Sequence, residues 1–138
     1  MCAVSVSLSH VTISSAQFAH SMAFYDAVLG ALGLVRTAEF GDEEESDAVL
    51  EAAGWGDAAA DPILWLVATA DPATATCAAH LALRAGSRAG VEAFFAAGLA
   101  HGGRSLRAPR RWAIYRRGQF AATLLDPDGN RVEAVAAE

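Results

Sequence analysis

Alternating apolar and polar positions occur twice along the chain, each time directly before a stretch of helical periodicity. Leu8–Ser14 alternates and is rich in β-branched side chains, which predicts a strand. The stretch after it predicts a helix that Ser14 or Ser15 caps and that ends at about Leu32, before Gly33. Its expected buried stripe, at helical spacing, consists of Phe18, Met22, Tyr25, Leu29 and Leu32.

The second half repeats this order. Ala78–Arg84 predicts a strand, Ser87 is the expected cap of the next helix, and Gly102 and Gly103 end that helix. Its expected apolar face consists of Val91, Phe94, Phe95 and Leu99. Shorter strand-like runs follow each helix: Leu34–Phe40, Ala48–Ala53 and Ile63–Thr69 after the first, and Leu106–Ile114, Gln119–Asp126 and Arg131–Ala136 after the second. The predicted order is therefore βαβββ, twice.

The two halves also align in sequence. When the chain is shifted by 70 residues, His10 lies over His80, and Phe, Leu and Gly residues also match. An alanine-rich chain matches itself readily, but alanine richness does not explain these particular matches. We expect a duplicated domain over residues 1–138, with modules at about 1–70 and 77–138.

Three segments between these elements have distinct compositions. Asp71–Thr76 is polar, contains proline and is the expected linker between the modules. Gly41–Asp47 is acidic, which predicts a solvated loop. Its consecutive carboxylates lack the glycine-turn spacing of a calcium loop, so a metal site is not expected there. Asp126–Asn130, with the sequence Asp-Pro-Asp-Gly-Asn, predicts a tight turn between two strands.

Composition excludes several classes of protein. With 54% hydrophobic and 19% charged residues, the 138-residue chain can build a core. The net charge of −6 argues against nucleic acid or an anionic membrane as a partner, and the absence of lysine excludes Schiff-base chemistry. The apolar run Ile63–Ala68 is far too short to span a bilayer, and Met1–Val4 is not a basic segment followed by the apolar stretch expected of a secretion signal. We expect a cytoplasmic protein.

Three residues could share a metal ion. His10 and His80 occupy equivalent positions on the first strands of the two modules, and Glu133 lies between apolar residues on the last strand. A strand histidine taken alone is more often a core or surface group, and a strand glutamate is usually solvated. Together, two imidazoles and one carboxylate form a facial triad that leaves coordination positions open for substrate.

The sequence resembles the vicinal oxygen chelate superfamily, which includes glyoxalases, bleomycin resistance proteins and extradiol dioxygenases. The matching stretches are Leu8–Ile13, Phe24–Leu34, His80–Leu83 and Leu125–Val135. The resemblance implies an α+β fold in which tandem βαβββ modules form a cupped half-barrel sheet around a metal ion, often in a homodimer.

The same resemblance places His10, His80 and Glu133 at metal-ligand positions. The fourth position of the glyoxalase I pattern falls near Ile63, where no ligand is present. The chain is therefore more similar to the two-His-one-Glu arrangement of extradiol dioxygenases and fosfomycin-type thiol transferases. The implied ion is divalent and could be Fe, Mn, Ni, Co or Zn, since affinity order does not choose among them.

Other side chains could contact the substrate. Trp65 could line the cup or belong to the core, and Tyr115 lies where similar proteins keep a tyrosine facing the metal. An arginine cluster around Tyr115, including Arg111 and Arg116, could bind a carboxylate or phosphate, although a solvated hairpin is slightly favoured. His20 and His101 are expected at the surface.

Two functions remain open. The first is a metal-dependent lyase, isomerase, dioxygenase or thiol transferase, with Glu133 and Tyr115 as catalytic residues acting on a small oxygen-bearing molecule. The second is a binding protein that sequesters a small molecule without catalysis, as bleomycin resistance proteins do. Three retained ligands favour the enzyme, and uncovered sheet edges favour a homodimer.

Overall fold

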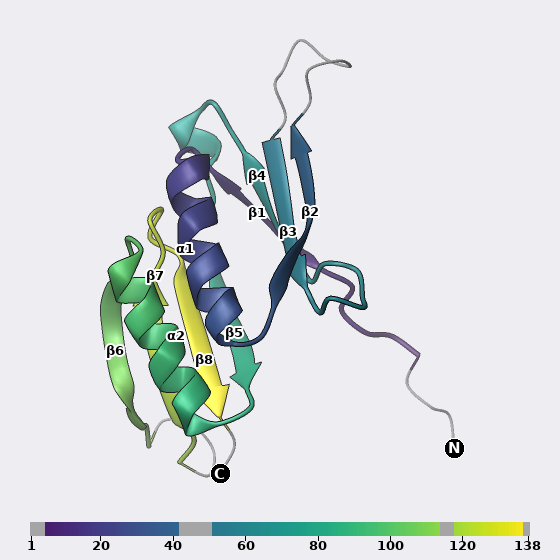
Figure 1. Ribbon diagram of the computed structural model, residues 1–138. Helices are drawn as coiled ribbons and strands as arrows, with labels where there is room; N and C mark the ends of the chain where they lie inside the picture. The colour runs from purple at the N-terminus through teal and green to yellow at the C-terminus, as the bar shows by residue number, and fades with distance from the viewer. Residues whose placement is uncertain (1–4, 42–50, 114–117, 137–138) are drawn as a thin grey trace.

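Two four-stranded sheets and two helices make up the computed structural model (Figure 1), which describes residues 5–41, 51–113 and 118–136. The first half contains β1 (Val11–Ser15), α1 (Phe18–Ala31), β2 (Val35–Gly41), β3 (Glu51–Gly56) and β4 (Leu64–Ala68). A 3-10 turn, η1 (Pro72–Thr74), precedes the second half, which contains β5 (His80–Ala85), α2 (Arg88–Ala100), β6 (Arg104–Arg111), β7 (Phe120–Leu125) and β8 (Arg131–Ala136).

Each half has the same topology. The first strand lies parallel beside the last, so the sheets have the orders β1-β4-β3-β2 and β5-β8-β7-β6. The remaining neighbours are antiparallel, which suits their short connections. The predicted α+β class with repeated βαβββ modules is confirmed, and the two sheets do not close into a barrel within the described ranges. The prediction that both modules form one domain stays a prediction.

The starts of the two helices differ from each other. Ser87 caps α2 as predicted, because its Oγ accepts a hydrogen bond from the Gly90 N–H. The prediction that Ser14 or Ser15 caps α1 is wrong: the N-cap position is Gln17, without a side-chain cap. The Ser15 hydroxyl is instead hydrogen-bonded to Asp128, on the turn between β7 and β8. No helix of the described ranges is long and apolar enough to cross a bilayer.

Strand boundaries shift by a few residues from those expected. β1 begins at Val11, not Leu8, and residues 5–10 before it are exposed. β6 begins at Arg104, two residues earlier than expected, whereas β8 matches the prediction. Most of the acidic segment Gly41–Asp47 lies outside the described residues.

The core lies between the helices and one face of each sheet. Figure 1 shows α1 and α2 next to each other, and α1 also contacts the strands of the first sheet. Because α1 is covered from two sides, Phe24 and Val28 are fully buried, whereas the predicted stripe residues Phe18 and Met22 are only partly buried. On α2, Leu99 was expected in the core but is 47% exposed.

Gly98 explains why α2 can lie so close to α1 and to β7. Its position faces Val28 of α1 and Leu124 of β7, and an added Cβ would overlap the Cδ1 of Leu124. Both neighbours are completely buried and cannot move aside. A glycine here therefore permits the contact between α1, α2 and the second sheet.

The turn after β7 joins the two modules. Asp128 accepts hydrogen bonds from the hydroxyls of Ser15 (2.5 Å) and Ser21 (3.1 Å) in the first module. Asp126 accepts one from the Tyr25 hydroxyl (2.6 Å) and is also bonded to Asn130. The segment predicted only as a tight turn thus places two carboxylates among buried donors of the other half.

We predict that Gly98→Ala destabilises the protein and that Gly30→Ala does not. The first substitution forces a methyl group against Leu124, which typically costs about 1–3 kcal/mol. Gly30 lies in α1 with no atom within 4 Å of an added Cβ, so alanine should stabilise the helix by up to about 1 kcal/mol. Urea unfolding of both variants measures the difference, and equal stabilities would contradict the packing at Gly98.

We also predict a stability loss at alkaline pH that depends on Tyr25. Burial, and then the carboxylates of Asp126 and Asp128, raise the pKa of the Tyr25 phenol well above its ordinary value. The stabilisation is complete below the unfolded-state pKa of about 10 and is lost as the pH rises above it, because the unfolded chain releases this proton first. Unfolding of Tyr25→Phe should depend less steeply on pH above about 10. Identical slopes for both proteins would contradict this.

Candidate functional site

Glu133 is a carboxylate buried in the middle of the second sheet. Its neighbours Val132 and Ala134 are fully buried in the core, so strand alternation turns Glu133 to the face opposite the helices. Only 2% of Glu133 is exposed. Burying a carboxylate is costly unless polar or positive groups surround it, so its partners determine what this position can do.

The main partner of Glu133 is His80. The Nε2 atom of His80 lies 3.2 Å from Oε1 of Glu133, and the Thr123 hydroxyl donates to Oε2 at 3.4 Å. The sheet produces this contact, because Ala82 lies opposite Glu133 in the parallel pair β5–β8 and His80 is two residues before it on the same face. The His80 side chain is 53% exposed, so the pair lies at the edge of solvent.

The pair provides two donor atoms of the kinds that divalent metals accept. As a neutral ring with a proton on Nε2, His80 donates to the carboxylate; without that proton, the Nε2 lone pair and Oε1 can bind the same cation. Nitrogen and carboxylate oxygen suit Mn, Fe, Co, Ni and Zn. Two donors are one fewer than a facial triad needs.

His10 is not part of this pair. It is exposed and directly precedes β1, and its Nδ1 is 3.1 Å from the hydroxyl of Ser9. Within residues 5–41, 51–113 and 118–136 there is no group of three His, Cys, Asp or Glu side chains able to hold a metal. The structure thus brings together two of the three predicted ligands, and the role of His10 stays a prediction.

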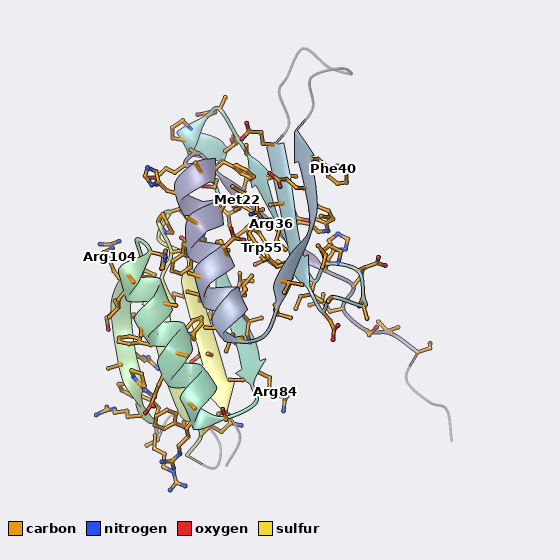
Figure 2. All side chains as sticks on the ribbon, viewed as in Figure 1. Met22, Arg36, Phe40, Trp55, Arg84 and Arg104 are labelled. Carbon is orange, nitrogen blue, oxygen red and sulfur yellow. The ribbon has the colours of Figure 1, made fainter. Side chains whose placement is uncertain are left out.

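Trp65 lies on the first sheet, away from the core. Its strand neighbours Leu64 and Leu66 are buried, so Trp65 faces the opposite side, where its ring stacks on Phe40 at 5.6 Å with an interplanar angle of 9°. Figure 2 shows the labelled Phe40 side chain beside β2, pointing away from the helices. Gly54 of β3 leaves room for the indole, because an added Cβ would be 3.0 Å from its Cε3 atom. The result is an aromatic surface with Phe40 60% exposed.

Of the other predicted contacts, the structure describes only Arg111. Tyr115 and Arg116 lie outside the described residues. Arg111 is exposed at the end of β6 and pairs with Phe120, whose ring belongs to the core, so it does not share the face of Glu133. His20 and His101 are exposed, as expected.

Sequence reasoning missed two neighbours of Glu133. Thr123 lies directly opposite it on β7, and Arg131 is two residues before it on β8 and faces the same side. The period of two along β8 could have identified Arg131. Thr123 could not be found this way, because cross-strand register depends on the length of the turn between β7 and β8.

Two hollows adjoin His80. One, of about 450 Å³, lies between β5 and the segment before β1 and is lined mainly by apolar side chains such as Leu8, Ile63 and Leu81. The other, of about 430 Å³, is lined by Leu106, Leu125 and Arg131 as well as His80. A small molecule could therefore reach the exposed edge of the His80 ring from either side.

Comparisons with known proteins agree with this architecture. The family described as the glyoxalase/bleomycin resistance protein/dioxygenase superfamily matches residues 7–134. A glyoxalase/bleomycin resistance protein from Albidiferax ferrireducens T118 is similar in structure, with a TM-score of 0.67, 29% identity, and coverage of 94% of this chain and 98% of that one.

Two further solved structures share the fold. A glyoxalase/bleomycin resistance protein/dioxygenase family enzyme from Burkholderia phytofirmans PsJN has a TM-score of 0.64 and 18% identity, over 96% of this chain and all of that one. Glyoxalase I from Zea mays has a TM-score of 0.65 and 23% identity, over 92% of this chain and 44% of that one. A search of curated proteins finds no match. From the family match over nearly its whole length, the chain belongs to the glyoxalase/bleomycin resistance protein/dioxygenase superfamily.

Proposed function

We propose that this protein is a metal-dependent enzyme that acts on a small oxygen-bearing molecule. In this proposal His80 and Glu133 of one subunit bind a divalent ion together with His10 of the partner subunit. The reaction would be of the lyase, isomerase, dioxygenase or thiol transferase type, as in the superfamily to which the chain belongs. The protein would act as a homodimer in the cytoplasm.

The observation that carries this proposal is the burial of Glu133 beside His80. A carboxylate that is only 2% exposed has one histidine and one distant hydroxyl as side-chain partners, which is weak compensation for its lost hydration. A cation held by His80 and Glu133 would supply the missing positive charge.

The position of His10 supports a site shared between two copies. β1 and β5 are edge strands of their sheets, and the segment before β1 exposes the apolar side chains of Val6 and Leu8 by 84% and 80%. Exposed apolar groups next to an uncovered strand edge favour contact with another chain. A second copy covering this segment could present its own His10 to the pair.

In this proposal, different side chains bind the metal ion, orient its ligands and contact the substrate. When bound, the divalent ion would act as a Lewis acid that polarises a substrate oxygen. His80 and Glu133 would hold it, and Thr123 would orient the carboxylate through its hydrogen bond. Trp65 and Phe40 lie on the sheet next to His10, so in the shared arrangement those of the partner subunit would line the opposite wall and exclude water, with Tyr115 as a further substrate contact.

A binding protein without catalysis is the second candidate. The stacked pair of Phe40 and Trp65 and the mainly apolar hollow beside Leu8 favour it, because both suit a flat organic molecule. It needs no third ligand. Metal content separates the two candidates.

We predict that Glu133→Leu does not destabilise the metal-free protein. Replacing a buried charged group by an apolar one of similar size is often neutral or stabilising, so the free energy of unfolding should stay constant or rise by about 1 kcal/mol. Thermal and urea unfolding in the presence of a chelator measure this. A loss of more than about 2 kcal/mol would show that Glu133 serves the fold and not a ligand.

We predict that His10→Ala and His80→Ala each abolish metal binding, and that a refolded equal mixture regains about a quarter of the wild-type content. Half of the random dimers are mixed, and each mixed dimer has one intact site of two. Elemental analysis after gel filtration gives the content, and light scattering gives the oligomeric state. His20→Ala is the matched control, since His20 is an exposed histidine of α1.

The outcomes separate the possible arrangements. No metal in the mixture, with normal metal in the wild type, would place all ligands within one chain. A wild-type protein that stays metal-free after incubation with Mn, Fe, Ni and Zn would refute the enzyme and favour the binding protein.

A further inference from the structure

Basic side chains are concentrated in the second module. All ten basic residues are arginines, and every one except Arg36 follows residue 77. Of the acids in this module that the structure describes, Asp126 and Glu133 are buried, Asp128 is hydrogen-bonded to Ser15 and Ser21, and Glu92 is exposed on the helix that covers the other side of the sheet. A protein of net charge −6 thus has one strongly cationic region.

The strand register places most of these arginines on the face of Glu133. Residues that pair directly in a sheet point to the same side, and Leu124, Ala122 and Val132 point into the core. On β7 and β8 their alternate neighbours face the opposite side. On β6 the register shifts between Ser105 and Arg107 and between Arg107 and Arg110, so Arg104, Arg107 and Arg110 are placed by their direct pairing with β7 and not by alternation. Three cross-strand rows result. These rows are His80–Arg131–Leu125–Arg104, Ala82–Glu133–Thr123–Arg107 and Arg84–Val135–Ala121–Arg110.

This face extends across the whole sheet. Figure 2 shows Arg104 and Arg84 at opposite ends of the second sheet. They belong to the first and the third row, and the row of Glu133 lies between these two in the register. Among the residues that the structure describes, the one carboxylate in these rows is that of Glu133, which is bonded to His80 and Thr123. Within the described part of the chain, the ion pairs are those of Arg36 and His80, so none of the five arginines in these rows lies within 4 Å of a carboxylate.

Two of these arginines are held in place by one indole. The guanidinium carbon of Arg110 lies 3.6 Å from the ring centre of Trp112, and that of Arg107 lies 5.5 Å from it. The indole is itself anchored, because its Nε1 donates to the carbonyls of Ala108 at 3.1 Å and Ala121 at 3.0 Å. Stacking uses the face of a guanidinium and leaves the N–H groups at its rim available to an anion.

Arg131 is in the same cross-strand row as His80. It is directly opposite His80 in the parallel ladder and two residues before Glu133, a separation of about 7 Å along the strand. Together with His80, Leu106 and Leu125 it lines the hollow of about 430 Å³. A group bound by Arg131 would therefore lie within one small molecule's length of Glu133.

We propose that the ligand of this site carries an anionic group, a carboxylate or a phosphate, and that Arg131 and Arg107 bind this group beside His80 and Glu133. This inference rests on the proposed function for the location of the reacting group. It adds the substrate class: a small organic anion with its charged group on the arginine rows. A neutral molecule of the same shape would leave these guanidinium groups unpaired.

Titration of the metal-free protein tests the proposal. Benzoate, phenyl phosphate and inorganic phosphate are added in the presence of a chelator and followed by NMR chemical shifts, with neutral benzamide as the uncharged analogue of benzoate. We expect at least one of the anions to bind in the millimolar range or tighter, and benzamide to bind at least about tenfold more weakly than benzoate. Equal binding of benzamide, or no binding of any anion, would overturn the proposal.

Variants locate the anion. Arg131→Gln and Arg107→Gln should each weaken the binding by about tenfold or more, because each removes a charge-assisted hydrogen bond. Arg88→Gln is the matched control: it removes the same charge from α2, on the other side of the sheet, and should leave the affinity unchanged. If all three variants lost the same affinity for the anion, the net charge of the protein would explain the binding, and the proposal would be overturned.

Two further measurements distinguish a small anionic ligand from a polyanion, and anion binding from metal binding. A single-stranded oligonucleotide that binds more tightly than phenyl phosphate, with losses in the same variants, would identify a nucleic-acid surface and overturn the proposal. If His80→Ala loses metal but retains anion binding, this result supports both the proposed metal site and the proposed anion site. Absence of metal in the wild type with intact anion discrimination refutes the proposed function alone, whereas metal binding without anion discrimination refutes this inference alone.

Discussion

The contact on which the arrangement of the two modules depends is the insertion of the β7–β8 turn into the first module. Asp128 accepts hydrogen bonds from Ser15 and Ser21, and Asp126 accepts one from Tyr25. These donors lie at the end of β1 and on α1, and all three are fully buried. A buried hydroxyl without an acceptor is costly, so the two carboxylates and the three hydroxyls require each other. Their pairing keeps α1 against α2 and directs the other faces of both sheets outward.

Those outward faces differ although the modules are repeats of one topology. The first sheet presents the stacked rings of Phe40 and Trp65, while the second presents Glu133 among rows of arginines. In the strand register the position that corresponds to Glu133 in the first module is Trp65, because Trp65 pairs with Thr12 as Glu133 pairs with Ala82, 70 residues further along the chain. The duplicated backbone has thus been kept, and the side chains that face away from the helices have diverged into one aromatic wall and one charged wall.

The burial of Glu133 distinguishes the charged face of the second sheet from an ordinary solvated surface. A solvated carboxylate on a strand would not indicate a ligand site. Glu133, however, is almost completely inaccessible and is paired with a half-exposed histidine. Water solvates the exposed arginines around this pair in the free protein, and the same guanidinium groups can bind an anion. The proposed ligand rests on this combination of a buried carboxylate with exposed cations.

The sequence by itself determined the order of elements and the face of Glu133. Alternation along β8 separates Glu133 from Val132 and Ala134, and the shift of 70 residues identifies the two equivalent halves, because periodicity and repetition are properties of the chain alone. It did not determine which side of α1 is buried, the partners of Asp128, or the rows that place Arg107 and Arg131 with Glu133. Those depend on the packing of one module against the other and on the register between strands, which only the tertiary structure sets. Equal positions in two repeats become neighbours only if the packing of the modules, or of two chains, brings them together. Within the described residues, His10 does not join His80 and Glu133 in a metal-binding group.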